Sequence, residues 1–266
     1  MYLEYWGIKK YPFDNVPDPD FFFMSKPHEE GLTRLLYAVE RGKGCALLSG
    51  EVGAGKTTLA KVLLRKISKE RYDIAMIANP CLETKEFLQD ILYKLGITDV
   101  PDSKVEILRI LYKKLTDNLE QNKGTLLIID EAQFIAGSTL EEIRLLLNYQ
   151  LSNRFLLTIF LMGQPELVDK VKAIRQLAQR VEISYFLRSF NFNETTDYIL
   201  FREKKAGLSK NVFSKQAIEI IFEHSNGIPR IINNLCDLAL LVGSGEKKTM
   251  ITYEVVKDII DDGAVF

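Results

Sequence analysis

The stretch GEVGAGKTT, residues 50–58, decides the fold, because its three glycines, lysine and two hydroxyls suit an anion cradle better than a hydrophobic core. Glycine tolerates positive φ, so such a loop can turn its backbone N–H groups toward phosphate oxygens. The full pattern G-x-x-x-x-G-K-[ST] is present, between a predicted strand at 45–49 and a predicted helix at 57–68. Strand, glycine loop and helix in this order predict a P-loop at the positive end of a helix dipole, with a chance glycine turn as the alternative.

The P-loop pattern assigns chemistry to the individual positions. Lys56 would reach the β- and γ-phosphates of a nucleotide, and the Thr57 hydroxyl would bind Mg²⁺. The residues expected to contact the nucleotide through this loop are Gly50, Glu51, Val52, Gly53, Ala54, Gly55, Lys56, Thr57 and Thr58.

Apolar strands alternate with amphipathic helices through the first two thirds of the chain. Strands are predicted at 45–49, 73–78, 125–130, 155–163 and 181–186, and helices at 32–41, 57–68, 84–95, 104–119 and 140–151. Strands that are apolar throughout indicate a parallel sheet covered by helices on both faces. Only helical patterns follow, at 194–206, 214–225, 229–241 and 253–261. We therefore predict an α/β P-loop NTPase fold, a three-layer αβα parallel sheet followed by an all-helical lid domain.

The N-terminal segment is rich in proline, aspartate and aromatic residues. Prolines at 12, 17 and 19 exclude a helix there, so we expect an extended arm whose aromatic side chains pack on the main domain. The predicted domains are this arm at 1–23, the P-loop core at 24–190 and the helical lid at 191–266.

Composition excludes several classes of protein. The formal net charge of -1 gives no whole-chain signal for nucleic acid or acidic membranes, and a basic cluster between residues 61 and 71 fits a solvated helix face. Three scattered cysteines and two histidines make a metal cluster improbable and fit a reducing, cytoplasmic compartment. The apolar run at 155–162 is far shorter than the ~20 residues that a bilayer requires. No signal peptide is recognisable at the N-terminus.

Two acids follow the apolar strand in LLIIDEAQ, residues 126–133. Asp130 would stand at the carboxyl end of a buried strand, where parallel sheets bind ligands, and would hold Mg²⁺ through a water. Glu131 is placed to act as general base on a water that attacks the γ-phosphate. Kinases use a substrate hydroxyl instead, so the pair favours an NTP hydrolase over a small-molecule kinase. A strand-end turn with solvated acids is the alternative.

Further polar residues are candidates for contacts to the γ-phosphate. In FLMGQPEL, residues 160–167, Gln164 would face it, although Gly163 and Pro165 fit an ordinary turn equally well. An arginine supplied by a neighbouring subunit can accelerate phosphoryl transfer by ~10³ to 10⁵. A surface ion pair is the common alternative for any single arginine. The arginines that follow the sheet are Arg175, Arg180, Arg188 and Arg230.

The motifs together resemble one family. GEVGAGKTT, LLIIDEAQ, FLMGQPEL, RQLAQRVEISYFL and HSNGIPRIINNLCDLAL follow YWGIKKYPFDNVPDPDFFFMSKPHEEGL in this order. The combination is similar to the AAA+ ATPases of the general secretion pathway protein A, or ExeA-like, family over nearly the whole chain. Relatives of that group serve exopolysaccharide and exosortase systems, and others are transposition helpers.

The resemblance implies roles for residues outside the loop. Gln164 matches the polar sensor 1 residue, and Arg230 resembles the sensor 2 arginine that contacts the γ-phosphate of its own subunit. Arg180 resembles the arginine finger offered to the neighbouring subunit's nucleotide, with Arg175 as a rival. Residues 25–32, SKPHEEGL, resemble the stretch that closes over the adenine, with His28 among the contacts. Cys81 and Cys236 match no family role and are expected to be buried small apolar residues.

The resemblance also implies an ATPase that uses ATP and Mg²⁺ as a switch or motor and forms a hexamer or another ring or helical oligomer. The expected role is support of an envelope secretion or polysaccharide export system, with a protein partner, in the cytoplasm or at the inner face of the membrane through that partner. The alternative is a transposition helper that binds duplex DNA. The low net charge favours the first, because surfaces that track phosphates usually need clustered lysine and arginine.

One departure from the founding members concerns the C-terminus. The secretion proteins continue into a transmembrane helix and a periplasmic peptidoglycan-binding domain, whereas this sequence ends at Phe266. The two readings are a member without a membrane anchor and a piece that stops before one. The resemblance therefore implies an ATPase, and it does not extend to the peptidoglycan-binding role of the founding members.

Overall fold

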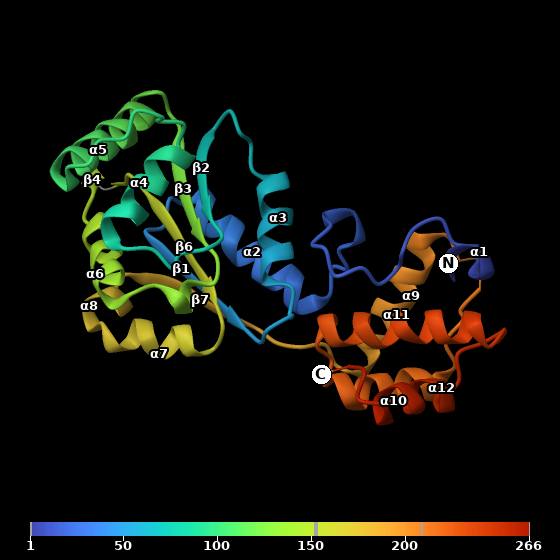
Figure 1. Cartoon of the computed structure of the whole chain (residues 1–266). Helices are drawn as coiled ribbons and strands as arrows, with labels where there is room; N and C mark the ends of the chain where they lie inside the picture. The colour runs from blue at the N-terminus through green and yellow to red at the C-terminus, as the bar shows by residue number, and fades with distance from the viewer. Residues whose placement is uncertain (1, 152–153, 209, 266) are drawn as a thin grey trace. The chain divides into compact units, whose positions relative to one another are not determined.

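The computed structural model describes residues 2–151, 154–208 and 210–265 (Figure 1). These residues form two compact units. The sheet unit comprises Pro27–Gly50 and Leu59–Leu187. The helical unit comprises Met1–Lys26, Glu51–Thr58 and Arg188–Phe266, so that most of the phosphate loop is grouped with it.

The sheet unit is built on five parallel strands in the order β2-β3-β6-β1-β7. They are β1 (Cys45–Gly50), β2 (Tyr72–Ile77), β3 (Gly124–Ile129), β6 (Thr158–Gly163) and β7 (Val181–Leu187). Every residue of β1 and β6 is buried, as expected for central strands covered on both faces. Ile129 pairs with Leu161, and Ser49 with Gly163, so β3, β6 and β1 end at the same edge of the sheet.

Helices cover both faces of this sheet, which confirms the predicted three-layer fold. Figure 1 shows α2 (Lys26–Glu40) and α3 (Lys56–Lys66) on one side, and α4 (Thr84–Lys94), α5 (Lys104–Glu120) and α6 (Gly137–Leu146) on the other. Phe87 and Ile91 of α4 are fully buried with Ile129 of β3 in one core, because side chains four apart share a helix face. The short helices α7 (Glu166–Ala173) and α8 (Arg175–Ala178) add to the same core.

Two predicted boundaries in the sheet unit are wrong. The helix expected at 140–151 ends at Leu146, where the N–H groups of Asn148 and Tyr149 bond three residues back and tighten the last turn. An antiparallel pair of short strands, β4 (Gln150–Leu151) and β5 (Arg154–Phe155), follows. The strand expected at 155–163 is therefore divided between β5 and β6. The leucine-rich pattern continues past the point at which the backbone leaves the helix.

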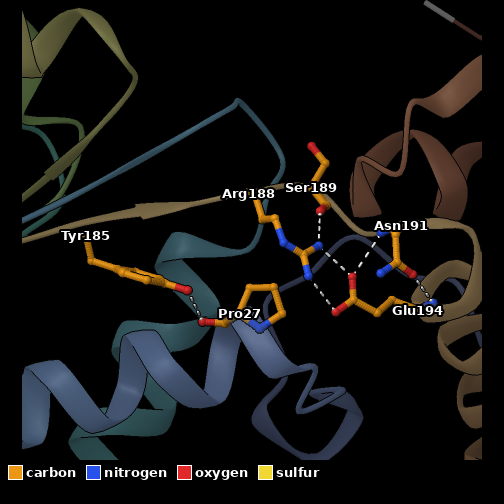
Figure 2. Close-up of polar contacts among 6 residues, drawn as sticks. All are labelled: Pro27, Tyr185, Arg188, Ser189, Asn191 and Glu194. Atoms are coloured by element: carbon orange, nitrogen blue, oxygen red, sulfur yellow. Dashed lines mark hydrogen bonds and ion pairs between the residues drawn. The ribbon is translucent and has the colours of Figure 1, made fainter.

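The helical unit contains α9 (Phe192–Ala206), α10 (Lys215–Ser225), α11 (Pro229–Gly245) and α12 (Tyr253–Asp261). A capping box starts α9: the Asn191 side chain accepts the N–H of Glu194 at 2.9 Å, and the Glu194 carboxylate accepts the N–H of Asn191 at 2.9 Å. Arg188 donates to the same carboxylate at 2.6 Å and 3.0 Å (Figure 2). This accounts for Arg188 as a structural residue.

The N-terminal segment differs from the extended arm that the prolines predict. Residues Tyr2–Trp6 form α1, ahead of the first proline, and Pro19–Phe21 form a 3₁₀ turn, η1. Tyr2 and Phe13 of this segment are buried in the core of the helical unit rather than on the sheet. The Trp6 indole donates to the Leu240 carbonyl at 2.9 Å.

A buried arginine of α9 holds the rest of this segment. The Arg202 guanidinium donates to the carbonyls of Pro12, Phe21 and Asp14, the last at 2.7 Å. Because three carbonyls of one irregular segment share a single guanidinium, this arginine fixes the path of a chain that has few regular backbone hydrogen bonds of its own.

The cysteines divide by burial. Cys45 and Cys236 are buried, and burial raises the pKa of the Cys45 thiol to about 12. Cys81 is exposed, so the prediction that it is buried is wrong. Every helix among the described residues is too short or too polar to cross a bilayer.

Candidate nucleotide-binding site

The phosphate loop follows β1 directly and ends where α3 begins. Gly53 and Gly55 have φ of 81° and 97°, a backbone region that favours glycine. A Cβ on Gly50 would lie 2.6 Å from the Leu187 carbonyl oxygen, because β1 and β7 pair there. The three glycines of the motif are thus required by backbone conformation or by close approach.

Lys56 occupies the first position of α3 and is only 6% exposed. Its ammonium donates to the Glu51 carbonyl at 2.9 Å, across the loop. The ammonium thus lies inside a glycine loop beside the backbone N–H groups of a helix N-terminus, an arrangement that fits a bound polyphosphate.

The loop lies against the start of α11 within the helical unit. A Cβ on Gly53 would be 2.6 Å from the Cβ of Arg230 and 3.2 Å from Cγ2 of Ile228. Arg230 is exposed, and its guanidinium is in no ion pair within the described ranges. The expected sensor 2 arginine and the loop are thus neighbours in this structure.

The two acids lie at the edge of the sheet where β1 ends. Asp130 is 3% exposed, and its carboxylate accepts the N–H of Glu131 at 3.0 Å. Glu131 has φ of 51°, in the left-handed region, which costs an ordinary residue of order 1 kcal/mol and is most common at functional sites.

An amide links the second acid to the end of the neighbouring strand. Nε2 of Gln133 donates to the Glu131 carboxylate at 2.6 Å, while its Oε1 accepts the backbone N–H of Gln164 at 3.1 Å. Lys170 donates to the Gln133 carbonyl at 2.7 Å. Gly163 is required beside this contact, because a Cβ there would clash with Oε1 of Gln133. The Gln133 side chain therefore links Glu131, which follows β3, to Gln164, which follows β6.

Comparison with protein families matches residues 39–171 to the AAA domain, which is half of the chain. The chain belongs to the AAA family. General secretion pathway protein A of Aeromonas hydrophila is 36% identical over 244 residues, 91% of this chain and 44% of that protein. The expected resemblance to this group is therefore confirmed.

A second relative has a different role in its name. ATP-dependent target DNA activator B of Escherichia phage Mu is 29% identical over 144 residues, 54% of this chain and 44% of that protein. The AAA chain thus spans less than half the length of either relative.

Solved structures agree on the fold. The ORC2 protein of Aeropyrum pernix, in ADPNP and ADP complexes, has a TM-score of 0.71 at 18% identity and covers 95% of this chain and 71% of that one. The RuvB Holliday junction branch migration motor of Thermotoga maritima has a TM-score of 0.58 at 18% identity, covering 90% and 70%. At such identities these likenesses establish the AAA+ fold alone.

The remaining expected residues of the AAA site are placed as follows. Arg180 is half-buried and donates to the Leu147 carbonyl at 3.3 Å and the Asn148 side chain at 2.8 Å. Its rival Arg175 is exposed at the start of α8. His28 lies within α2 and is buried, so nearly all of the segment expected to close over the adenine, residues 25–32, forms the first two turns of a helix.

Figure 2 also shows how the start of α2 is held within the sheet unit. The Tyr185 hydroxyl of β7 donates to the Pro27 carbonyl at 2.9 Å. Tyr185 and Gln133 both act on expected site residues through hydrogen bonds, and sequence reasoning assigned neither a role. For Gln133 the only signal was its place in DEAQ, two residues after the expected base.

Proposed function

We propose that this AAA chain binds ATP with Mg²⁺ and hydrolyses the γ-phosphate bond, using the energy as an assembly switch or motor. The observation that carries the proposal is the buried Lys56 at the head of α3, in a loop whose glycines are conformationally required. The acids that follow β3 add what hydrolysis needs beyond binding. The donor set fits the ligand: an ammonium and backbone N–H groups for phosphate, and a hydroxyl and a carboxylate for Mg²⁺.

In this proposal the chain's own residues divide the work. Lys56 binds the β- and γ-phosphate oxygens, while Thr57 and Asp130 hold Mg²⁺, which would offset the charge on the phosphates. Glu131 accepts the proton of the attacking water, and Gln133 fixes its carboxylate. Gln164 would orient the water or the γ-phosphate from the neighbouring strand.

The lid and the oligomer supply the remaining contacts. Arg230 would reach the γ-phosphate of its own subunit, and Arg180 that of the adjacent subunit in a hexamer or related assembly. His28 would contact the adenine from α2. These roles depend on residues 24–190 acting as the ATPase core and 191–266 as the lid. Hydrolysis would then depend on assembly, because one subunit completes the site of the next.

The system that this ATPase serves is proposed from the likeness to general secretion pathway protein A, which covers 91% of this chain. We infer an envelope secretion or polysaccharide export machine, with a protein partner at the cytoplasmic face of the inner membrane. The second candidate is a transposition helper that binds duplex DNA. It is favoured by the likeness to the phage Mu activator, whose name specifies target DNA.

Two variants test the enzymatic proposal. Lys56→Ala should abolish ATP binding, whereas Glu131→Gln should bind ATP and leave it unhydrolysed, with Glu120→Gln, an exposed acid at the end of α5, as the matched control. Filter binding of labelled ATP and phosphate release measure the two steps. Normal turnover by Glu131→Gln would place the general base elsewhere.

The same Glu131→Gln protein separates the two biological roles. Light-scattering mass with ATP and Mg²⁺, with and without duplex DNA across a salt series, is the measurement. ATP-dependent growth on DNA with a steep salt dependence would identify a DNA-loading factor. A closed oligomer indifferent to DNA would favour the secretion role.

A further inference from the structure

A polar cavity lies in the sheet unit, away from the phosphate loop. It has a volume of about 240 Å³ and is lined by four basic side chains, Arg41, Arg71, Lys123 and Arg154. Arg41 follows the end of α2, Arg71 precedes β2, Lys123 precedes β3 and Arg154 begins β5. Four segments separated in sequence thus bring cations to one place.

This basic cavity is at the opposite edge of the sheet from the expected catalytic residues. Arg71 and Lys123 lie just before the amino ends of β2 and β3, whereas Asp130 and Gln164 follow the carboxyl ends of β3 and β6. Because all five strands are parallel, these ends are separated by the length of a strand. A ligand in the basic cavity would therefore be distinct from the nucleotide.

The charges around the basic cavity are unbalanced. Glu40 is the only acid among its lining residues. Nearby lysines have partners: Lys43 pairs with Glu182 at 2.8 Å, and Lys114 with Asp73 at 2.6 Å. Within the ranges that the structure describes, the four lining cations make no ion pair and no side-chain hydrogen bond. Lys123 has an electrostatic interaction with Asp73, whose carboxylate is already paired with Lys114. The surplus is local, because the whole chain has a net charge of -1.

The negative carboxyl ends of nearby helices offer a simpler explanation for basic residues at this cavity. This explanation accounts for only part of the surplus positive charge. The carboxyl ends of α2 and α5 each carry about half a negative charge, which attracts cations. Backbone N–H groups already close both ends: Gly42 donates to Val39 at 3.1 Å, and Lys123 to Asn118 at 2.8 Å. Four cations, one carboxylate and two helix ends leave about two positive charges unbalanced.

We propose that the basic cavity binds a phosphate group of a ligand other than the ATP of the phosphate loop. Three of the four lining cations are arginines, whose planar fork matches phosphate oxygens in pairs. The volume of about 240 Å³ is below the roughly 300 Å³ at which pockets begin to hold whole drug-sized ligands, so it suits one phosphate group. That group would come from a small inorganic anion or from the phosphodiester backbone of a nucleic acid.

The test uses R41Q/R71Q/K123Q, which removes three charges and keeps polar side chains at the three positions. The matched control is R109Q/K113Q/K172Q, which makes the same charge change at exposed helical positions of the sheet unit. All proteins are saturated with ADP and Mg²⁺, so that the phosphate loop is closed to the probes. Sodium pyrophosphate is titrated by calorimetry, and a labelled duplex DNA by anisotropy over a salt series. Circular dichroism checks folding, and the single variant R71Q replaces the triple variant should that one unfold.

Each outcome decides the proposal. The proposal is supported, with a nucleic acid as the source of the phosphate, when only the cavity variant loses DNA affinity by about tenfold or more. The slope of log affinity against log salt concentration should then fall by up to about three. A loss of pyrophosphate binding, without DNA binding in any protein, would support it with a small anion as the source. Three results would overturn the proposal. They are unchanged binding of both probes in the cavity variant, an equal loss of binding in the control variant, and no binding of either probe by the unsubstituted chain. The cavity variant and its control both leave the phosphate loop unchanged, so the difference between them does not depend on whether the chain hydrolyses ATP.

Discussion

Replacing Glu203 by glutamine should remove a pH-dependent penalty from the helical unit. Glu203 lies on α9 and is 1% exposed. Its Oε1 accepts the N–H of Val212 at 2.9 Å, and its Oε2 has no hydrogen-bond partner among the described residues. Burial raises the pKa of this carboxyl from 4.5 to about 7. The folded state therefore binds its proton more tightly than the unfolded chain does.

The sign and size of the effect follow from this shift. Between pH 4.5 and pH 7 the folded protein carries more protons at Glu203 than the unfolded one, so the free energy of unfolding falls as pH rises. A shift from 4.5 to about 7, at 1.36 kcal/mol per unit, gives a full penalty of about 3 kcal/mol above pH 7. Between pH 5 and pH 8 the change is about 2 kcal/mol, because part of the penalty is already present at pH 5.

Urea unfolding followed by tryptophan fluorescence measures this directly. Trp6 is the only tryptophan of the chain, and its indole is bonded to Leu240 inside the same unit. Glutamine keeps the acceptor for Val212, while its amide N–H groups add a cost of about 1–3 kcal/mol that does not depend on pH. The difference in unfolding free energy between Glu203→Gln and the parent should therefore shift by about 2 kcal/mol in favour of the variant from pH 5 to pH 8. Parallel curves for the two proteins would refute the reasoning, and Glu223→Gln on the exposed face of α10 should give no such shift.

Three further predictions concern the site. Gln133→Leu should reduce the turnover number for ATP about tenfold with ATP binding unchanged, since it removes a positioning hydrogen bond of about 1.4 kcal/mol from Glu131; equal turnover in a phosphate-release assay would contradict this. Gly53→Ala should weaken ATP binding about tenfold, because the φ of 81° costs a non-glycine residue about 1–2 kcal/mol, and calorimetry with ATP measures the loss. Arg180→Ala should bind ATP without hydrolysing it, and mixing it with Lys56→Ala should restore some activity; a mixture as inactive as its parts would assign the finger elsewhere.

The fold was largely predictable because the burial of a strand and the conformation of a glycine loop depend mainly on residues that are neighbours in the sequence. The strand at 45–49 is apolar at nearly every position, and the structure buries all of β1. Errors arose where tertiary contacts decide. The leucines before Gln150 continue a helical pattern, but Gln150 and Leu151 form a strand that pairs with Arg154 and Phe155. The aromatic residues of the N-terminal segment could pack on either unit as far as the sequence shows.

The candidate site was predictable at the loop and the acids, where each motif position has one chemical use. Gln133 was not, because its role depends on the register that places Gln164 one strand away, and register is not visible in a single sequence. The left-handed conformation of Glu131 was equally hidden, since nothing in LLIIDEAQ demands it. The roles of Arg180, Arg230 and His28 remain predictions from the resemblance.

The grouping of the first residues with the last helices has a consequence for synthesis on the ribosome. Tyr2, Ile8 and Phe13 share a core with Phe213, Leu235 and Val256, so the helical unit is completed only after the sheet unit that lies between these residues in the sequence has been made. Nearly all of the sheet unit has been made once Leu187 is reached, and it can begin to fold while the N-terminal aromatic side chains wait for their partners. A fragment that starts at residue 191 would lack these side chains and expose the apolar surface they cover. We therefore expect nascent chains to need protection from aggregation until α12 has been made and can pack with the N-terminal aromatic side chains.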